Sequence, residues 1–196
     1  NPEGEQGLQV GRLISARALG KEVPGITINR YCASGLEAIS QAVSKINAGF
    51  GHIYIAGGAE SMSMIPFTGY KLAPSYKANL ENLNYHVGMG ATAEAVAGKY
   101  NISREAADKF SYDSHMKAAS AIDGGKFKDQ IVPIEIEEVF VTDGKRKTKI
   151  HTVAVDEGVR RETTLEGLAK LRPAFKIGGT VTAGNASQTS DGAAFT

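Results

Sequence analysis

The stretch Gly25-Ile-Thr-Ile-Asn-Arg-Tyr-Cys-Ala-Ser-Gly-Leu36 passes from one type of secondary structure into another. Its first five residues, 25–29, are rich in β-branched side chains and predict a short buried strand. Over residues 33–48, apolar side chains recur at spacings of three and four, the pattern of one helical face: Leu36, Ile39, Val43 and Ile46. Residues 52–56 predict a second strand. Strand, helix and strand with short connections predict a βαβ unit, and therefore a parallel sheet covered by helices.

The sequence around this unit predicts further elements. Helices are expected at residues 4–19, from near Thr92, from Ser103 to about Ile122, and behind a capping box formed by Thr163 and Glu166. Strands are expected at residues 131–142 and 148–155, on either side of the hairpin signal Asp143-Gly144, and at residues 179–187. The fold class is therefore α/β.

The character of the sequence changes after Met64, where proline, glycine and asparagine interrupt any regular pattern. We therefore expect an α/β half over residues 1–61, an α+β insertion over residues 62–178 and a return to the α/β half over residues 179–196.

Composition excludes several classes of protein. The 22 basic and 21 acidic residues nearly balance, so no net charge favours nucleic acid or an anionic membrane as a partner. No apolar run is long enough to cross a bilayer, and no secretory leader is visible. A single cysteine cannot form an internal disulfide, which favours a reducing compartment, and we expect the cytoplasm. Four scattered histidines and one cysteine predict no metal site.

Cys32 is the residue with the clearest chemical signal. It lies where the predicted strand turns into the predicted helix, close to the free N–H groups and the positive end of the helix dipole. Such a position favours the thiolate, which is the nucleophilic form of cysteine, and the same N–H groups can stabilise an oxyanion. The small neighbours Ala33 and Gly35 leave room for a substrate. These features predict a reactive thiol without identifying its reaction.

The segment Ile28–Leu36 resembles the acyl-enzyme cysteine motif of the thiolase family. Further blocks follow in that family's order: Gly57-Gly-Ala-Glu-Ser-Met-Ser63, Met89-Gly-Ala-Thr-Ala-Glu94, Asp156-Glu157 with Arg160, Leu171-Arg-Pro-Ala-Phe175, and Gly179-Thr-Val-Thr-Ala-Gly-Asn-Ala-Ser187 with Asp191-Gly192. The resemblance covers essentially the whole chain. It implies a layered α/β thiolase fold, of which this chain supplies the amino-terminal half, with residues 62–178 as the loop domain that holds coenzyme A.

The resemblance also implies roles for individual residues. Cys32 is the nucleophile that attacks a 3-ketoacyl-CoA, releases acetyl-CoA and passes the acyl group to a second CoA, as in fatty acid β-oxidation. The residues expected to line the CoA and substrate site are His86, Arg160, Phe175, Ala183 and Ser187. CoA and acyl-CoA are substrates, no cofactor is expected to be bound permanently, and a homodimer or tetramer is expected.

The sequence departs from the family pattern in its catalytic partners. The family carries a His-Pro-Gly histidine that activates the nucleophile and a second cysteine that acts as acid and base, and neither motif occurs here. The chain starts without methionine and stops within a pattern, so we expect an excised piece that does not turn over by itself.

Several alternatives remain at this point. The Asn29-Arg30 pair resembles the degradative, 3-ketoacyl-CoA-cleaving branch more than the biosynthetic one. The alternatives are a biosynthetic acetyl-CoA acetyltransferase or a non-catalytic relative that only binds acyl-CoA. A ketoacyl synthase of the same superfamily is a further possibility, although the loop-domain blocks favour a thiolase. Residues 88–93 also match a Gly-x-Gly-x-x-Ala dinucleotide fingerprint, but no clear strand precedes them.

Overall fold

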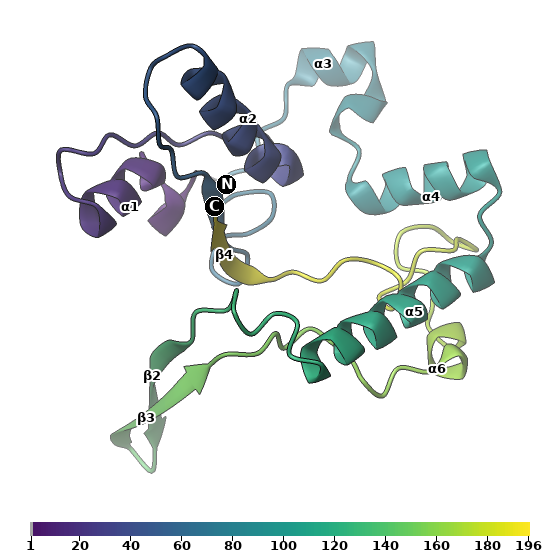
Figure 1. The fold of residues 1–196 in the computed structure, drawn as a ribbon. Coiled ribbons are helices and arrows are strands. Elements are labelled where there is room, and N and C mark those ends of the chain that lie inside the picture. The colour runs from purple at the N-terminus through teal and green to yellow at the C-terminus, as the bar shows by residue number, and fades with distance from the viewer. Residues whose placement is uncertain (1) are drawn as a thin grey trace. The chain divides into compact units, whose positions relative to one another are not determined.

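The structure is a computed structural model that describes residues 2–196. It divides into two compact units, residues 2–82 with residues 189–196, and residues 83–188 (Figure 1). The expected domain boundaries at residues 61/62 and 178/179 stay predictions. None of the described helices combines the length and the apolar content needed to cross a bilayer.

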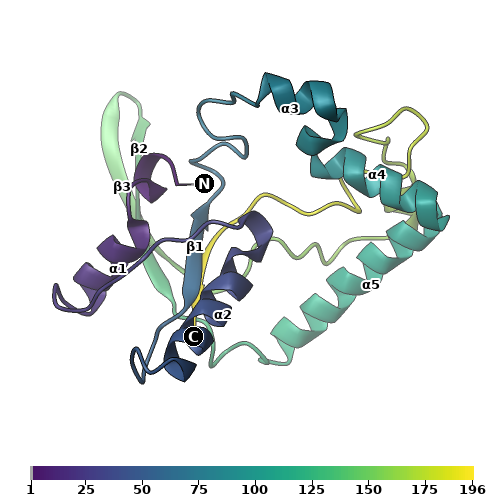
Figure 2. The same ribbon diagram turned by 90° about the horizontal axis from the view of Figure 1, so that it is seen from above.

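The first unit contains mainly helices around one small sheet. Its elements are η1 (Gly4–Gln6), α1 (Val10–Ala18), η2 (Tyr31–Ala33), α2 (Ser34–Asn47), β1 (Gly57–Ser61), α3 (Tyr76–Glu81) and β4 (Asp191–Phe195). The expected helix at residues 33–48 is confirmed by α2, which lies alongside β1 (Figure 2). The expected helix at residues 4–19 is divided, because Gly4 and Leu8 have positive φ angles of 54° and 53° that interrupt helical geometry.

The sheet of the first unit is antiparallel, and the expected parallel pairing is wrong for this chain. Strand β1 pairs with β4, from Gly57 opposite Phe195 to Ser61 opposite Asp191. Ala56 extends this ladder through two backbone hydrogen bonds with Thr196, of 2.9 and 2.8 Å. The predicted strands at residues 25–29 and 52–56 lie outside the named strands, because a strand requires a neighbouring strand to accept and donate its backbone hydrogen bonds.

Helix α1 holds the extended segment that precedes Cys32. The Gly11 N–H donates to Thr27 Oγ1 at 2.8 Å, and the Thr27 N–H donates to Gln9 Oε1 at 3.0 Å. The two backbones approach so closely that a Cβ atom on Gly11 would lie 2.3 Å from the Ile26 carbonyl oxygen. Glycine at position 11 is therefore required by this contact.

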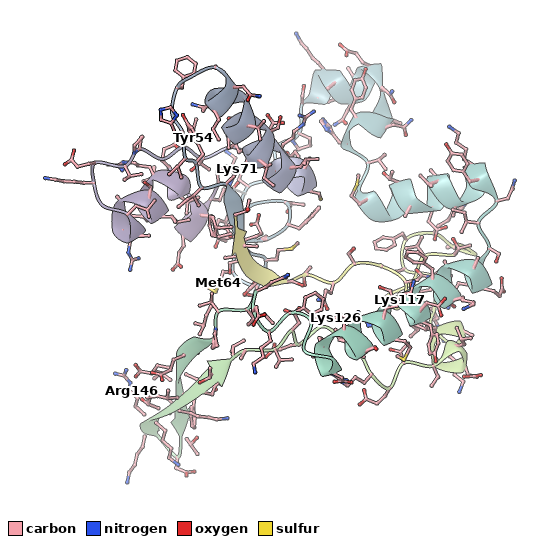
Figure 3. All side chains as sticks on the ribbon, in the orientation of Figure 1. Tyr54, Met64, Lys71, Lys117, Lys126 and Arg146 are labelled. Carbon is pink, nitrogen blue, oxygen red and sulfur yellow. The ribbon has the colours of Figure 1, made fainter. Side chains whose placement is uncertain are left out.

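The second unit contains helices and a long hairpin. Its elements are η3 (Leu83–His86), α4 (Met89–Tyr100), α5 (Arg104–Asp123), β2 (Ile134–Thr142), β3 (Lys145–Val153) and α6 (Leu165–Ala169). The predicted start of α5 is confirmed, since the Ser103 hydroxyl accepts a hydrogen bond from the Ala106 N–H at 3.1 Å. The predicted hairpin is confirmed as well, with positive φ angles at Asp143 and Gly144. Every residue of β2 is exposed, and Arg146 lies close to the hairpin turn (Figure 3).

The capping of α6 differs from the prediction. Thr164, not Thr163, is the N-cap, and its hydroxyl accepts from the Gly167 N–H at 3.0 Å. The Thr163 hydroxyl instead donates to the Arg160 carbonyl oxygen at 2.8 Å. The expected capping box between Thr163 and Glu166 is therefore wrong by one residue, because the first threonine is used to close the preceding turn.

The predicted strand at residues 179–187 is also wrong. This segment forms a tight loop in which only Thr182 makes an isolated bridge, to Pro173. The returning strand comes later, as β4. The N–H groups of residues 180–182 donate to side chains of α4 and of the loop itself, so they are not available to a strand partner.

We expect Gly11→Ala to destabilise the protein by about 1–3 kcal/mol, because the added methyl group must displace the backbone at Ile26. Within a helix, the same change at an open position normally stabilises by about 0.5–1 kcal/mol. Gly98→Ala in α4 is the matched control, since nothing lies within 4 Å of its Cβ position. Urea unfolding of both variants measures the difference, and an equal gain in stability at both positions would contradict the proposed close contact.

Candidate active site

Cys32 lies in a turn that is closed by its own neighbouring side chains. Tyr31 adopts the left-handed conformation with φ of 49°, and its N–H donates to Asn29 Oδ1 at 3.0 Å. The Ser34 hydroxyl accepts from the Arg30 N–H at 2.8 Å and donates to the Tyr31 carbonyl oxygen at 2.7 Å. A non-glycine residue in this conformation is uncommon, and these three hydrogen bonds stabilise it. The result is a fixed turn that leads directly into α2.

The thiol of Cys32 is accessible. The residue is exposed and lies in η2, immediately before the 14-residue helix α2. The first N–H groups of an α-helix have no partner within the helix, and they favour negative charge nearby. The sequence therefore placed Cys32 correctly at the amino end of a helix.

The cation nearest to Cys32 in sequence is already paired. The Arg30 guanidinium bonds Glu37 Oε2 at 2.6 Å, and the Gln41 amide donates to Glu37 Oε1 at 3.1 Å. The hydrogen bonds from Gln41 and then from Arg30 lower the pKa of Glu37 below its ordinary value. Because Arg30 faces this carboxylate, the helix end is the local feature that can stabilise negative charge on the Cys32 sulfur.

The five residues expected to contact CoA all belong to the second unit, whereas Cys32 belongs to the first. His86 is exposed at the end of η3, and Ala183 and Ser187 are exposed in the loop that precedes β4. The Phe175 side chain is half exposed and lies against Gly90, where a Cβ atom would come within 2.2 Å of its ring. The structure thus presents these side chains at the surface of their unit.

Arg160 and its neighbour Arg161 have different surroundings. The Arg160 backbone is fixed, since its N–H donates to His115 Nδ1 at 3.3 Å and its carbonyl accepts from Thr163. Its side chain lines a hollow of about 290 Å³ together with Glu162, Thr163, Thr164, Gly167 and Leu168. Arg161 instead pairs with Asp123 at 2.8 Å, which raises the pKa of Arg161. Within residues 2–196, no carboxylate forms an ion pair with Arg160.

A buried polar network was not predicted from the sequence. Glu94 of α4 is only 7% exposed, and its carboxylate accepts from the N–H groups of Thr180 and Val181 at 2.8–3.0 Å. Asn185 donates to Asp108 Oδ1 and to the Thr180 carbonyl oxygen, both at 2.9 Å. The only signal in the sequence was that Glu94 and Asn185 both lie in blocks that carry the family resemblance.

The same network joins α5 to α6. Arg104 bonds Asp108 at 2.7 Å and also donates to the carbonyl oxygens of Leu168 and Leu171. Leu168 is buried, at 6% exposure. The loop that contains Ala183 and Ser187 is therefore attached to α4 and to α5, and α5 is attached to α6.

A protein-family model matches nearly the whole chain. The family model described as the thiolase N-terminal domain matches residues 3–196. The chain belongs to the thiolase family. The expected α/β thiolase fold is thereby confirmed, and the dinucleotide fingerprint at residues 88–93 falls at the start of α4, where η3 precedes it rather than a strand.

Individual relatives support the same assignment. The chain is 51% identical over 195 residues to the 3-ketoacyl-CoA thiolase of Bacillus subtilis, and this alignment covers 98% of the chain and 50% of the relative. A crystal structure of the Bacillus anthracis acetyl-CoA acetyltransferase matches with a TM-score of 0.80 and 35% identity, over 98% of the chain and 50% of that structure.

A structure of human mitochondrial 3-ketoacyl-CoA thiolase in complex with CoA matches with a TM-score of 0.75 and 38% identity, over 93% of the chain and 46% of that structure. The thiolase chain spans about half the length of the relatives it matches.

The Glu94 interaction predicts a dependence of stability on pH. Hydrogen bonds from the N–H groups of Thr180 and then Val181 hold the pKa of Glu94 below its ordinary value of 4.5. Its stabilising contribution is therefore complete above the pKa of the unfolded chain, and it is lost as the pH falls through the lower folded pKa.

We expect Glu94→Gln to be less stable than the wild type at pH 7, and this difference to shrink as the pH is lowered from 7 to 3. Thermal unfolding across this range measures it. Glu137→Gln, at an exposed position of β2, is the control and should show little difference at any pH. A constant difference for Glu94→Gln at all pH values would refute the role of its charge.

Proposed function

We propose that the protein is a thiolase-type acyltransferase in which Cys32 forms an acyl-enzyme thioester. The observation that supports this most directly is an exposed cysteine in a fixed turn at the start of a helix, within a thiolase amino-terminal domain. The degradative branch is favoured, with 3-ketoacyl-CoA as substrate, because Asn29 and Arg30 precede the turn and the Bacillus subtilis relative is named a 3-ketoacyl-CoA thiolase.

The proposed reaction has two steps. The Cys32 thiolate attacks the 3-keto carbon, the bond between carbons 2 and 3 breaks, and the electron pair leaves on acetyl-CoA, which takes up a proton. The thiol of a second CoA then loses its proton and attacks the thioester, and Cys32 leaves as a thiolate. The N–H groups at the start of α2 are suited to stabilising negative charge that develops next to Cys32.

The loop-domain residues supply the proposed CoA site. Phe175 and Ala183 offer apolar surface for the pantetheine arm, and the Ser187 hydroxyl is suited to hydrogen-bond an amide of that arm. His86 is proposed to lie near the acyl end, and Arg160 near the adenine nucleotide. Within residues 2–196 the Arg160 guanidinium forms no ion pair with a carboxylate, and its place in the hollow supports a phosphate contact, since arginine binds phosphate well. CoA and acyl-CoA are substrates in this proposal, with no permanently bound cofactor.

A second candidate is the biosynthetic acetyl-CoA acetyltransferase activity. It is favoured by the match to the Bacillus anthracis acetyl-CoA acetyltransferase, whose TM-score of 0.80 exceeds the 0.75 of the human thiolase structure with CoA. Both activities use the same thioester, so the rates of thiolysis with 3-ketoacyl-CoA substrates of different chain length distinguish them. Cleavage restricted to acetoacetyl-CoA would favour the biosynthetic candidate.

The remaining parts of the proposal concern setting and assembly. We propose a homodimer or tetramer located in the cytoplasm, with acyl-CoA and CoA as its partners and without nucleic acid or membrane. Sedimentation of the protein as it occurs in its source organism determines the assembly.

We expect Cys32 to accumulate an acyl group when the protein, as it occurs in its source organism, is incubated with 3-ketoacyl-CoA. Intact-mass spectrometry should show one added acyl group, and iodoacetamide labelling of Cys32 should be slowed by acyl-CoA. Cys32→Ser should prevent both effects while folding normally, because the residue is exposed. A thioester that forms equally in Cys32→Ser would exclude this residue as the nucleophile.

We expect Arg160→Ala to weaken CoA binding by about five- to tenfold, because one exposed charge-assisted contact to phosphate is lost. Arg161→Ala is the matched control. It removes the same charge one residue away, but Arg161 is already paired with Asp123, so binding should change less than twofold. Isothermal titration with CoA compares the two, and equal losses would indicate a general effect of positive charge rather than a contact at residue 160.

A further inference from the structure

One face of α4 contacts two separate segments that carry proposed CoA residues. Gly90 and Glu94 are four residues apart, so they lie on the same side of the helix. Phe175 lies against Gly90, and the N–H groups of Thr180 and Val181 bond Glu94. A single helical turn therefore holds both the apolar and the polar part of the proposed site.

The two segments are also joined to each other. The Ala174 N–H donates to the Val181 carbonyl oxygen at 2.9 Å, next to Phe175. The residue after Val181 is bonded within the same loop, since the Thr182 N–H donates to Asn185 Oδ1 at 2.8 Å. Residues 174–185 thus form one hydrogen-bonded segment. Ala183 lies inside it, and Ser187 follows two residues after Asn185.

The Glu94 interaction depends on close approach and on charge. A Cβ atom on Gly179 would lie 2.2 Å from Glu94 Oε1, so a larger residue at position 179 would displace the carboxylate from its present position. A buried carboxylate is costly unless its oxygens are hydrogen-bonded. Here both oxygens accept from fixed backbone N–H groups, an arrangement that sets the direction of the loop more strictly than apolar packing alone.

We propose that Glu94 is a positioning residue for CoA binding, which acts by fixing the loop that carries Ala183 and Ser187 and the neighbouring Phe175. This inference rests on the proposed function. Glu94 contacts the loop backbone, so it acts through the residues that it holds and not on the reacting atoms.

The test is steady-state thiolysis and CoA titration with the protein as it occurs in its source organism. Glu94→Gln keeps the size of the side chain but places an amide NH₂ against N–H donors. It should raise both the KM and the Kd for CoA about tenfold, while kcat changes less than threefold. The reason is that the lost interaction stabilises bound CoA equally in the ground state and in the transition state. Glu94→Asp is too short to keep both contacts and should show the same split, whereas Glu137→Gln should match the wild type.

A double-mutant cycle with Ser187→Ala separates positioning from a general loss of stability. If Glu94 acts through the loop, then Ser187→Ala should weaken CoA binding much less in the Glu94→Gln background than in the wild type. Gly90→Ala provides a second route, because its methyl group must displace the Phe175 ring, and it should also raise the KM for CoA.

The outcomes are distinguishable. Absence of the Cys32 thioester and of CoA binding in the wild type would remove the proposed function itself. If the wild type forms the thioester and binds CoA, then any of three results overturns the positioning role alone: an unchanged KM for CoA in folded Glu94→Gln, a loss confined to kcat, or full additivity with Ser187→Ala. Should Glu94→Gln fail to fold, the same readings on Glu94→Asp and Gly90→Ala decide.

Discussion

The hydrogen bonds from the backbone N–H groups of Thr180 and Val181 to the Glu94 carboxylate attach the loop before β4 to α4, and the proposed CoA site depends on this attachment. Buried apolar side chains are few in the described part of the chain: Ala56, Ile65, Ala119 and Leu168. With so little apolar surface removed from water, packing alone does not specify how a glycine-rich loop returns over the helices. Directional hydrogen bonds donated to a buried carboxylate supply that specification, and Asp108 and Asn185 extend it to α5.

The turn around Cys32 is held by hydrogen bonds between residues that are close in sequence. Its hydrogen bonds join Asn29 to Tyr31 and Ser34 to Arg30 and Tyr31, all within six residues. A turn of this kind forms without help from distant parts of the chain. The loop beside Glu94 depends on partners 86 and 87 residues away. The thiolase chain therefore carries its proposed nucleophile in a locally determined turn, and its proposed CoA site in a segment that only tertiary structure can place.

This difference explains which predictions from the sequence succeeded. Helix α2, the Ser103 cap and the Asp143-Gly144 hairpin depend on neighbouring residues, and the sequence predicted all three. The strands predicted at residues 25–29, 52–56 and 179–187 failed because a strand requires a pairing partner elsewhere in the chain, and the local sequence does not show whether that partner is present. The placement of Cys32 at a helix start was predictable for the same local reason, whereas Glu94 was not, because a glutamate in an alanine-rich helix gives no sign that it is buried.

Ion pairing distinguishes the arginines of this chain from one another. Arg30 and Arg161 each contact a carboxylate, of Glu37 and Asp123 respectively. An arginine in such a pair must lose that contact before it can bind an anion, so its net gain is small. The Arg160 guanidinium has no ion pair with a described carboxylate, while its backbone is fixed at both ends by His115 and Thr163. Arg161 at the neighbouring position is paired, so two adjacent arginines differ in their surroundings, and the proposed phosphate contact is assigned to Arg160 alone.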